Sequence, residues 1–424
     1  MRWAGRRAIS SVALNLLEIK QMAKPNYRGI IQLFEAADRE KRPREEAQRV
    51  LRESIASDRS MLQGLDFGAL WSEMYGWNNF HHCRSTGKMA WEVMEAAGPV
   101  MTSSFQQITQ QFIYGIVMDA YKSPEFIFTK LIPTRNTQFD FERIAGVTDI
   151  GDEAQIVKEG NNYPVAGPAE TYRNAPVLRK RGFRVQLTRE VVFFDRTGQL
   201  VQMASNGSKS MGQNREKRAI DCIIDENAGA ASAVIGGHRY NYRGNSIASF
   251  GNSSGNHDWD NLSGTTTLVD WTDIEACEIL LAAIDDPTTG EPVVLGTKRH
   301  LVCATANKLT ALRIRNATEI VVVTPGYNTT GNPTESKVGN PYGGAFEVVS
   351  SPYYERRAAT DTTWIYGDVE AACEYCQAWP EEVKTLAGGT QLEFDRDIVQ
   401  QYRFSEFGNY AVKEPRALVQ ATVA

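Results

Sequence analysis

The sequence predicts an α+β fold organised around one long helix. Three observations support it. From Gly198 to Ile224, apolar residues recur at steps of three and four, which predicts a single amphipathic helix. From Pro292 onward, short strand-like runs alternate with helix-like segments, a mixture typical of α+β domains. The composition, 42% hydrophobic and 23% charged over 424 residues, is that of an ordinary globular protein with a sizeable core.

Residues 1–100 are expected to form a helical N-terminal extension. The segment Phe34–Ile55 is dense in Glu, Arg and Ala and is interrupted by Pro43. The first 60 residues hold 13 Lys/Arg and 8 Asp/Glu, a net charge of +5, which leaves −10 for the remainder. Such a basic leader on an acidic body is either a solvated helical extension or an arm that faces nucleic acid or a scaffold.

A buried stripe predicts a second helix, from Gln106 to Tyr121. Apolar residues fall on one face at spacings of four, and Ser123-Pro124 ends the helix because proline disfavours a helical residue before it. The stripe consists of Ile108, Phe112, Ile116 and Ala120.

Two alternating strands, Thr137–Arg143 and Arg181–Thr188, flank a polar excursion from Ala145 to Leu178. We expect the two strands to form a ribbon that leaves a domain and returns. Because an isolated two-stranded ribbon is marginal in water, it should need a neighbour to pack on. Loops of this length without a core of their own usually bind something or are disordered, and well-patterned flanking strands favour binding. The basic residues Arg179-Lys180-Arg181 at the root of the returning strand are expected either to form salt bridges or to bind phosphate.

Within the long helix, Gly207 and Gly212 indicate the close approach of another backbone, since glycine disfavours a helix interior. Residues 236–267 are rich in Gly, Asn and Ser and predict a loop. A helix capped by Thr272 or Asp273 should run from Trp271 through Ile284. The later strands are expected at Pro292–Leu295, His300–Ala304, Glu319–Val323, Phe346–Val349 and Thr362–Tyr366, with a closing pair at Asp397–Phe404 and Tyr410–Val419.

No catalytic, cofactor or metal site is expected. Gly251-Asn252-Ser253-Ser254-Gly255 fits a nucleophile-elbow pattern with His257 nearby, but it lies in a Gly/Asn/Ser loop without the required strand and helix. Cys373–Cys376 is a lone C-x-x-C without a second ligand pair, and predicts reduced cysteines near a helix start. The adjacent residues His81-His82-Cys83 point in different directions, so they seldom share one metal. The six cysteines form no disulfide framework, and no apolar run is long enough for a membrane span.

The order of these parts resembles the tailed-bacteriophage major capsid protein family. The matching stretches include the arm near Phe126–Pro133, the segment Gly343–Tyr353 leading into Thr363–Asp368, and the closing Phe394–Arg403 with Pro415–Val419. The resemblance implies a helical extension that is scaffold-like at 1–100, an N-arm at 101–135, an extended loop at 136–188, a peripheral domain with a spine helix at 189–290, an axial domain at 291–390, and a return to the peripheral domain at 391–424.

The resemblance implies a non-enzymatic major capsid protein that self-assembles into an icosahedral shell around double-stranded DNA. The shell would be assembled in the host cytoplasm and found in the virion. Expected partners are copies of itself in pentamers and hexamers, portal and scaffold or protease proteins, and weakly held DNA, with no cofactor and no membrane. A protein nanocompartment and a tail protein are the alternatives, and a hydrolase using Ser253 and His257 is a third. The residues expected at contacts between subunits are Phe139, Phe141, Lys158, Tyr163, Arg179, Arg181 and Phe183.

Overall fold

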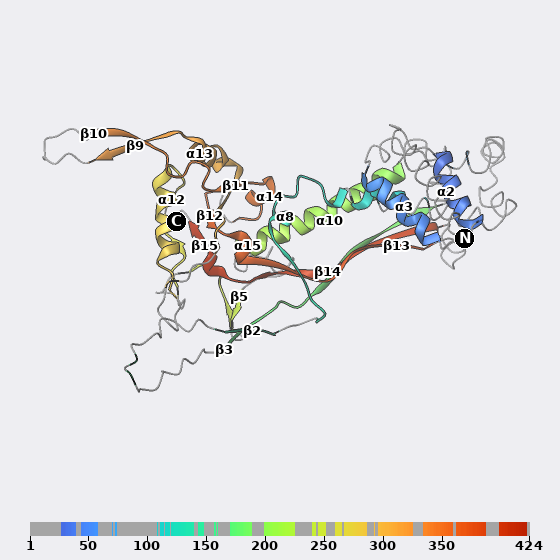
Figure 1. Cartoon of the computed structure of the whole chain (residues 1–424), viewed down its shortest axis with the longest axis horizontal. Coiled ribbons are helices and arrows are strands. Elements are labelled where there is room, and N and C mark those ends of the chain that lie inside the picture. Colours follow the sequence, from blue (N-terminus) through green and yellow to red (C-terminus); the bar gives the residue numbers. More distant parts are fainter. Residues whose placement is uncertain are drawn as a thin grey trace. The chain divides into compact units, whose positions relative to one another are not determined.

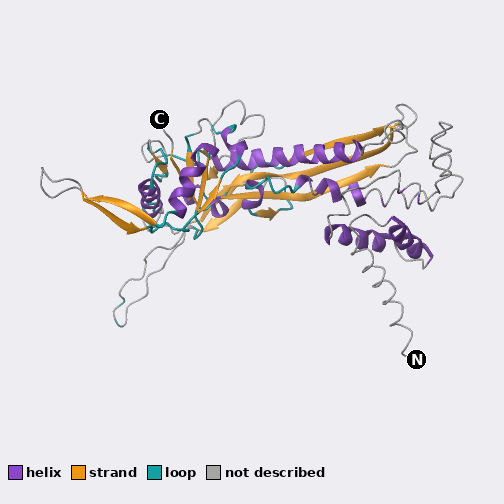
Figure 2. Ribbon diagram, turned by 90° about the horizontal axis from the view of Figure 1, so that it is seen from above, coloured by secondary structure: helices purple, strands orange, loops and turns teal. Residues whose placement is uncertain are grey.

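The computed structural model describes most of the chain from Tyr27 to Ala421, and its elements are shown in Figures 1 and 2. The described residues are 27–39, 44–57, 70, 73, 108, 111–113, 115–118, 120–139, 143–147, 157, 159, 170–188, 199–224, 240–242, 245–251, 259–264, 267–285, 292, 296–324, 334–358, 362–386 and 398–421. They divide into two compact units. Unit 1 comprises Met1–Ser123, Arg181–Gly212 and Glu381–Ser405, and unit 2 comprises Pro124–Lys180, Gln213–Pro380 and Glu406–Ala424.

Unit 1 contains the two N-terminal helices, α2 (Tyr27–Arg39) and α3 (Arg44–Ser57), which pack on each other. Pro43, where an interruption is expected, lies between them and outside the described residues. Of the predicted helix from Gln106 to Tyr121, every described residue is helical. Its stripe residues Ile108, Phe112 and Ile116 are buried, as the spacing of four predicts.

The long helix, α10 (Gln199–Ile224), starts within one residue of its predicted position and ends at the predicted residue. The Cβ that an alanine would add at Gly207 would lie 2.7 Å from a ring carbon of Phe183. The close approach predicted at Gly207 is therefore confirmed, but the neighbour is an aromatic side chain and not another backbone. Phe183 also stacks on Phe404 at 5.7 Å between ring centroids, within a buried cluster that includes Met211 and Tyr402.

The expected ribbon between Thr137–Arg143 and Arg181–Thr188 is wrong. The returning strand, β4 (Arg179–Thr188), lies in a four-stranded sheet of order β1-β13-β14-β4, next to β14 (Ile398–Val412). The other two members are β1 (Thr134–Asn136) and β13 (Cys373–Leu386), which pair in parallel. Residues 137–139 are not a strand. Alternation predicted a half-buried strand at β4, but it carries no information on which strand is the partner.

A different hairpin forms inside the polar excursion. Strand β2 (Arg143–Val147) pairs antiparallel with β3 (Glu170–Asn174). The sheet continues through two short strands, β5 (Tyr240–Tyr242) and β6 (Asn245–Ile247), in the order β2-β3-β5-β6 (Figure 1). Part of the segment predicted as a polar loop is therefore a strand.

A five-stranded sheet, of order β11-β8-β12-β15-β7, forms the core of unit 2. Its strands are β7 (Leu262–Ser263), β8 (His300–Cys303), β11 (Glu347–Val349), β12 (Trp364–Gly367) and β15 (Leu418–Ala421). Its helices are α8 (Phe128–Leu131), α12 (Trp271–Ala282), α13 (Thr305–Asn316), α14 (Pro352–Glu355) and α15 (Val369–Ala372).

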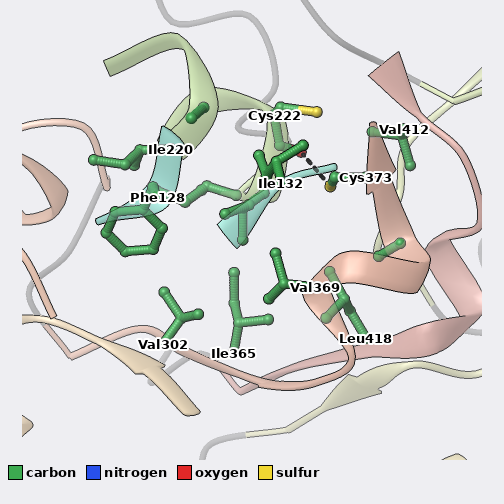
Figure 3. Close-up of a cluster of buried hydrophobic side chains, with 14 of the residues drawn as sticks. Phe128, Ile132, Ile220, Cys222, Val302, Ile365, Val369, Cys373, Val412 and Leu418 are labelled. Carbon is green, nitrogen blue, oxygen red and sulfur yellow. Dashed lines mark hydrogen bonds between the residues drawn. The ribbon is translucent and has the colours of Figure 1, made fainter. Parts of the chain in front are cut away.

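Both faces of this sheet are buried, because alternate residues belong to two different clusters. Val302 and Ile365 lie in a cluster with Phe128 of α8 and Ile220 of α10 (Figure 3). Leu301 and Cys303 of β8, with Trp364 and Tyr366 of β12, belong to a second cluster with residues of α12 and α13. The run His300–Cys303 is wholly buried, which explains why it is continuously apolar after the histidine.

Three further expectations need correction. The N-cap of α12 is Asp270, and Asp273 completes a capping box at the third position instead of acting as the cap. The segment from Cys373 is the long strand β13 and not a helix start. The predicted closing pair is one strand, β14, followed by β15. Gly408 lies within β14 and does not form a turn. A Cβ at this position would lie 2.5 Å from the Tyr375 hydroxyl, so the glycine marks the close approach of that side chain.

Five cysteines lie in the described part of the chain, and all five are buried free thiols. Burial raises the pKa of the Cys277 and Cys303 thiols to about 12, and burial beside Glu374 raises the pKa of Cys376 to about 11. At pH 8 we therefore expect Cys277 and Cys303 to react with a maleimide at least about a thousandfold more slowly than free cysteine. Mass spectrometry after labelling, with and without denaturant, measures this directly. Rapid labelling of Cys277 in the native protein would contradict the burial described here.

Candidate functional site

The β2–β3 hairpin is the strongest candidate for a functional element. Its register is continuous from Arg143↔Asn174 to Val147↔Glu170, and the guanidinium carbon of Arg143 lies 4.3 Å from the ring centroid of Tyr172. Beyond β3, the sheet gains only the short strands β5 and β6, with the single register pair Arg173↔Tyr242. The 22 residues of the tip, 148–169, lie outside the described residues except Val157 and Glu159. A hairpin this small gains little burial within its own sheet.

The root of the hairpin is held by Glu374, at the start of β13. One carboxylate oxygen accepts a hydrogen bond from the Arg173 guanidinium of β3 at 3.0 Å, and the other lies 3.3 Å from Nε of Arg135 in β1. The side chain of Glu374 is 7% exposed, and that of Arg173 is 16% exposed. This buried carboxylate is compensated in charge by two arginines, one of which also donates a hydrogen bond to it, and it connects three strands. We call Arg135, Arg173 and Glu374 the root triad.

Buried charges on α10 connect this long helix to its surroundings. The Glu216 carboxylate accepts backbone N–H groups of Ile127, Phe128 and Thr129 at 2.9–3.0 Å, together with the Thr129 hydroxyl at 2.8 Å. It thereby satisfies the otherwise unpaired N–H groups at the start of α8. Two residues further along the helix, the Arg218 side chain has no exposed surface, and it forms an ion pair with Glu406 of β14.

Two aromatic hydroxyls lie beside these charges. The Arg215 guanidinium lies 4.3 Å from the ring centroid of Tyr375, and the Tyr375 and Tyr410 rings are 4.7 Å apart. Burial raises the pKa of both tyrosines, so both stay protonated at neutral pH. The two tyrosine rings therefore pack against the buried arginine as neutral groups. This arrangement is typical of a structural network that supports buried charges.

A second hairpin, of β9 (Glu319–Thr324) and β10 (Thr334–Gly339), forms a two-stranded sheet of its own (Figure 1). Val338 is 49% exposed, and the exposed Lys337 lies 3.9 Å from Glu319. Exposed pairs of this kind contribute little to stability. This hairpin, like β2–β3, therefore gains little from its own contacts.

Four of the seven residues predicted at subunit contacts lie in the described part of the chain. Phe139 is 63% exposed, Arg179 is exposed and Arg181 is half-buried. Phe183 packs within its own chain, on Phe404 and Gly207. Phe141, Lys158 and Tyr163 lie outside the described residues. The four described side chains do not form one cluster, and the role of all seven between subunits stays a prediction.

The motifs weighed for chemistry show no active-site arrangement where they are described. Ser253, His257 and the His81-His82-Cys83 run lie outside the described residues. Gly251 donates its N–H to the Asn261 side chain at 3.0 Å, and Asn261 also bonds the carbonyls of Ser249, Pro415 and Leu418, which ties this loop to the last strand. Among the described residues, no group of three or more His, Cys, Asp or Glu is placed to hold a metal. No described helix is long and apolar enough to cross a membrane.

Sequence reasoning missed the root triad and the charges on α10. Glu374 lies inside the C-x-x-C run, whose two cysteines are the residues that such a motif normally singles out. Glu216 and Arg218 lie in a stretch of α10 whose charges resemble a solvated face. The sequence does hold a weak signal for buried charges. The charged run Arg215–Arg218 interrupts the apolar spacing in a part of the helix that is otherwise buried. Which charges are buried depends on partners far away in the sequence.

Replacing Glu374 with Gln is expected to loosen the hairpin root. The variant keeps the shape but loses the charge that two arginines share, so the free energy of unfolding should fall by about 1.5–3 kcal/mol. Hydrogen exchange of residues 170–174 should also become faster. The matched control is Glu382→Gln on the same strand, whose half-exposed pair with Lys384 should be worth less than about 1 kcal/mol. Equal exchange in both variants would contradict the triad's role.

The architecture places the protein in a structural class. A long helix and a long-stranded sheet carry an anchored hairpin, without a described catalytic arrangement, and this combination suits a building block of an assembly. A family model described as "Phage capsid protein" matches residues 173–421, which is more than half of the chain. The chain belongs to this phage capsid protein family. It is therefore a structural protein of the virion, as the sequence led us to expect, and it acts by assembling with copies of itself.

Several solved capsids are similar in structure at low identity. The capsid of a native GTA particle is 11% identical with a TM-score of 0.43, covering 72% of this chain and 94% of that one. The Gordonia phage Cozz structure is 12% identical with a TM-score of 0.43, covering 71% and 87%. A virus-like particle from Pyrococcus furiosus is 10% identical with a TM-score of 0.39, covering 73% and 98%. The search of curated proteins finds no match. The assignment rests on the family model.

Proposed function

We propose that the protein is the major capsid protein of a tailed phage or prophage, and that it assembles into a closed icosahedral shell around double-stranded DNA. The observation that carries this proposal is the family match over residues 173–421, which contains the spine helix, the long strands and the five-stranded sheet. In this proposal the β2–β3 hairpin belongs to the extended loop, with the outer bounds 136–188. The segments 189–290, 291–390 and 391–424 form the peripheral domain, the axial domain and the return to the peripheral domain.

The hairpin of one subunit is proposed to lie across the spine and peripheral region of the next. Two features support this arrangement. The root triad holds the base of the hairpin, and beyond its own two strands the described hairpin pairs with β5 through the register pair Arg173↔Tyr242. Contacts with a neighbouring copy would add the support that so small a sheet needs, and closed symmetry would add many weak contacts into a stable shell.

The other parts of the proposal concern partners. Portal, scaffold or protease proteins and weakly held DNA are proposed, together with a scaffold-like role for residues 1–100 and the arm at 101–135. The net charge of −5 suits a lining along which DNA slides instead of being gripped. The hairpin contacts, and the seven residues Phe139, Phe141, Lys158, Tyr163, Arg179, Arg181 and Phe183, remain proposals.

Electron microscopy of the purified chain tests the proposal. Closed shells are expected, and their nucleic-acid content separates a phage head from a nanocompartment, which would hold protein cargo. Open tubes would indicate a tail protein. If the folded chain forms neither shells nor capsomers over a wide range of concentration and salt, with and without co-expressed phage partners, the proposal is wrong.

A further inference from the structure

The outward face of helix α12 is apolar and exposed. Ile279, in the middle of this face, is 63% exposed, and Ala282 and Ala283, three and four positions later, are exposed beside it. The opposite side of the helix holds the buried residues Ile274 and Cys277, which pack on the five-stranded sheet. A helix that is apolar on both sides is typical of one that is covered on both sides. The single chain covers only the side that faces the sheet.

Helix α13 carries a second exposed apolar face on the same side of the sheet. Leu309 is 66% exposed, and Leu312, three positions later, is half-buried. Residues of α12 and α13 belong to one buried cluster with residues of β8, β12 and β15, so both helices cover the same face of the sheet (Figure 1). α12 contacts β7, β12 and β15, whereas α13 contacts β8 and β11. The two outward faces therefore lie over different halves of one sheet face.

The two helices carry opposite charges. The charged residues of α12 are all acidic, and those of α13 are all basic. Glu275 lies one turn before Ile279 on the outward face of α12, whereas Glu278 lies on its flank and pairs with Arg299 of the same chain. On α13, Lys308 and Arg313 lie on either side of Leu309. The side chains of Glu275, Lys308 and Arg313 are all exposed. Each copy thus has an acidic apolar face and a basic apolar face.

We propose that the outward face of α12 in one subunit docks on the outward face of α13 in a neighbouring copy. Ile279 then lies against Leu309 at the centre, and Glu275 meets the basic side chains around Leu309. A central apolar contact with complementary charges at its rim is the usual anatomy of a protein interface. The occupant is a second copy because one chain supplies both complementary faces. This inference rests on the proposed function, because it names a contact between subunits of the shell.

Replacing Ile279 with Lys should weaken assembly strongly. The variant removes the central apolar contact and places a positive charge against the basic face of α13. The protein concentration needed for half-maximal shell assembly should therefore rise by about tenfold or more. Lysine is a good helix former and the position is exposed, so the denaturant midpoint of the soluble subunit should stay unchanged. The matched control, Ile279→Leu, keeps an apolar side chain of the same size and should shift assembly by less than about twofold.

Exchanging the charges of the two faces tests their pairing. Glu275→Arg alone, and the double variant Lys308→Glu with Arg313→Glu, should each raise the half-maximal assembly concentration by about threefold or more, because like charges then face each other. Combining all the substitutions in one chain restores opposite charges, so it should recover at least about half of the loss on a logarithmic scale. Losses that simply add in the combined chain would overturn the contact between α12 and α13.

Cross-linking identifies the partner face directly. One chain carries Ile279→Cys and another carries Leu309→Cys, and an equal mixture is assembled into shells and treated with a short bismaleimide. The five described native cysteines are buried free thiols and should react slowly, and wild-type shells give the background. A peptide pair joining positions 279 and 309 is expected from the mixture alone, and only two different copies can produce it. Shells without this pair, or with Ile279→Cys chains linked only to each other, would overturn the proposal.

Failure of this inference is distinguishable from failure of the proposed function. If the wild-type chain forms shells and the Ile279→Lys variant assembles equally well, the two helix faces are not a contact between subunits, while the capsid function stands. If the wild-type chain forms neither shells nor capsomers under any condition, both proposals are wrong.

Discussion

Replacing residues 148–169 with an Asn-Gly turn is expected to leave a folded, soluble subunit that forms no shells. Val147 and Glu170 are directly opposed in the β2–β3 register, so a two-residue turn closes the shortened hairpin without disturbing either strand. The root triad and the core of unit 2 remain complete. The free energy of unfolding should therefore change by less than about 1 kcal/mol, because surface loops tolerate shortening well.

Assembly should respond very differently to this deletion. If each subunit contributes one weak tip contact, removing it from every member of a closed ring removes the cooperative gain of the whole ring. Negative-stain microscopy and sedimentation of the shortened chain measure the outcome. The control is shortening the β9–β10 loop, residues 325–333, by the same turn chemistry. Normal shells from the chain without the 148–169 tip would show that the hairpin is not the intersubunit contact.

Replacing Arg218 with Leu is expected to give the largest loss of subunit stability. The Arg218 side chain has no exposed surface and that of Glu406 is 1% exposed, so the variant leaves a carboxylate buried without its partner. Removing one member of a buried pair typically costs about 3–5 kcal/mol. Chemical denaturation of the soluble subunit, followed by tryptophan fluorescence, measures the change.

The double variant Arg218→Leu with Glu406→Leu provides the decisive comparison. It removes both charges, so it should recover most of the lost stability. Lys217→Leu, on the same helix but only partly buried, is the matched control and should change stability by less than about 1 kcal/mol. If the single and double variants are equally unstable, packing and not the unpaired charge explains the loss.

Local patterns predicted the helices well. The long helix α10 lies within one residue of its predicted bounds, and the stripe of Ile108, Phe112 and Ile116 is buried as expected. Helical periodicity depends on neighbours three and four positions away, so it is written in the local sequence. Strand positions at β8, β9, β11 and β12 were also close, because β-branched and aromatic runs bounded by turn residues are local signals.

Strand pairing was the main failure. The partner of β4 is β14, more than 200 positions later, and the partner of β2 is β3, inside the presumed loop. The Cys373 segment was assigned to a helix start, although β13 begins there. The sequence predicts two strands where the structure has the single strand β14, because Gly408 resembles a strand break. In the structure, the nearby Tyr375 hydroxyl leaves no room for a side chain at Gly408. Each error concerns a neighbour that is distant in sequence.

The amino-acid sequence by itself determined the mixed α and β class, the long helix and the resemblance to phage capsid proteins. These follow from periodicity, composition and the order of elements, all of which are properties of one chain read in order. The root triad and the Arg218–Glu406 pair emerged only from the folded chain. Burial of a charge depends on which strands and helices lie side by side, and side-chain alternation along a strand does not specify its neighbour.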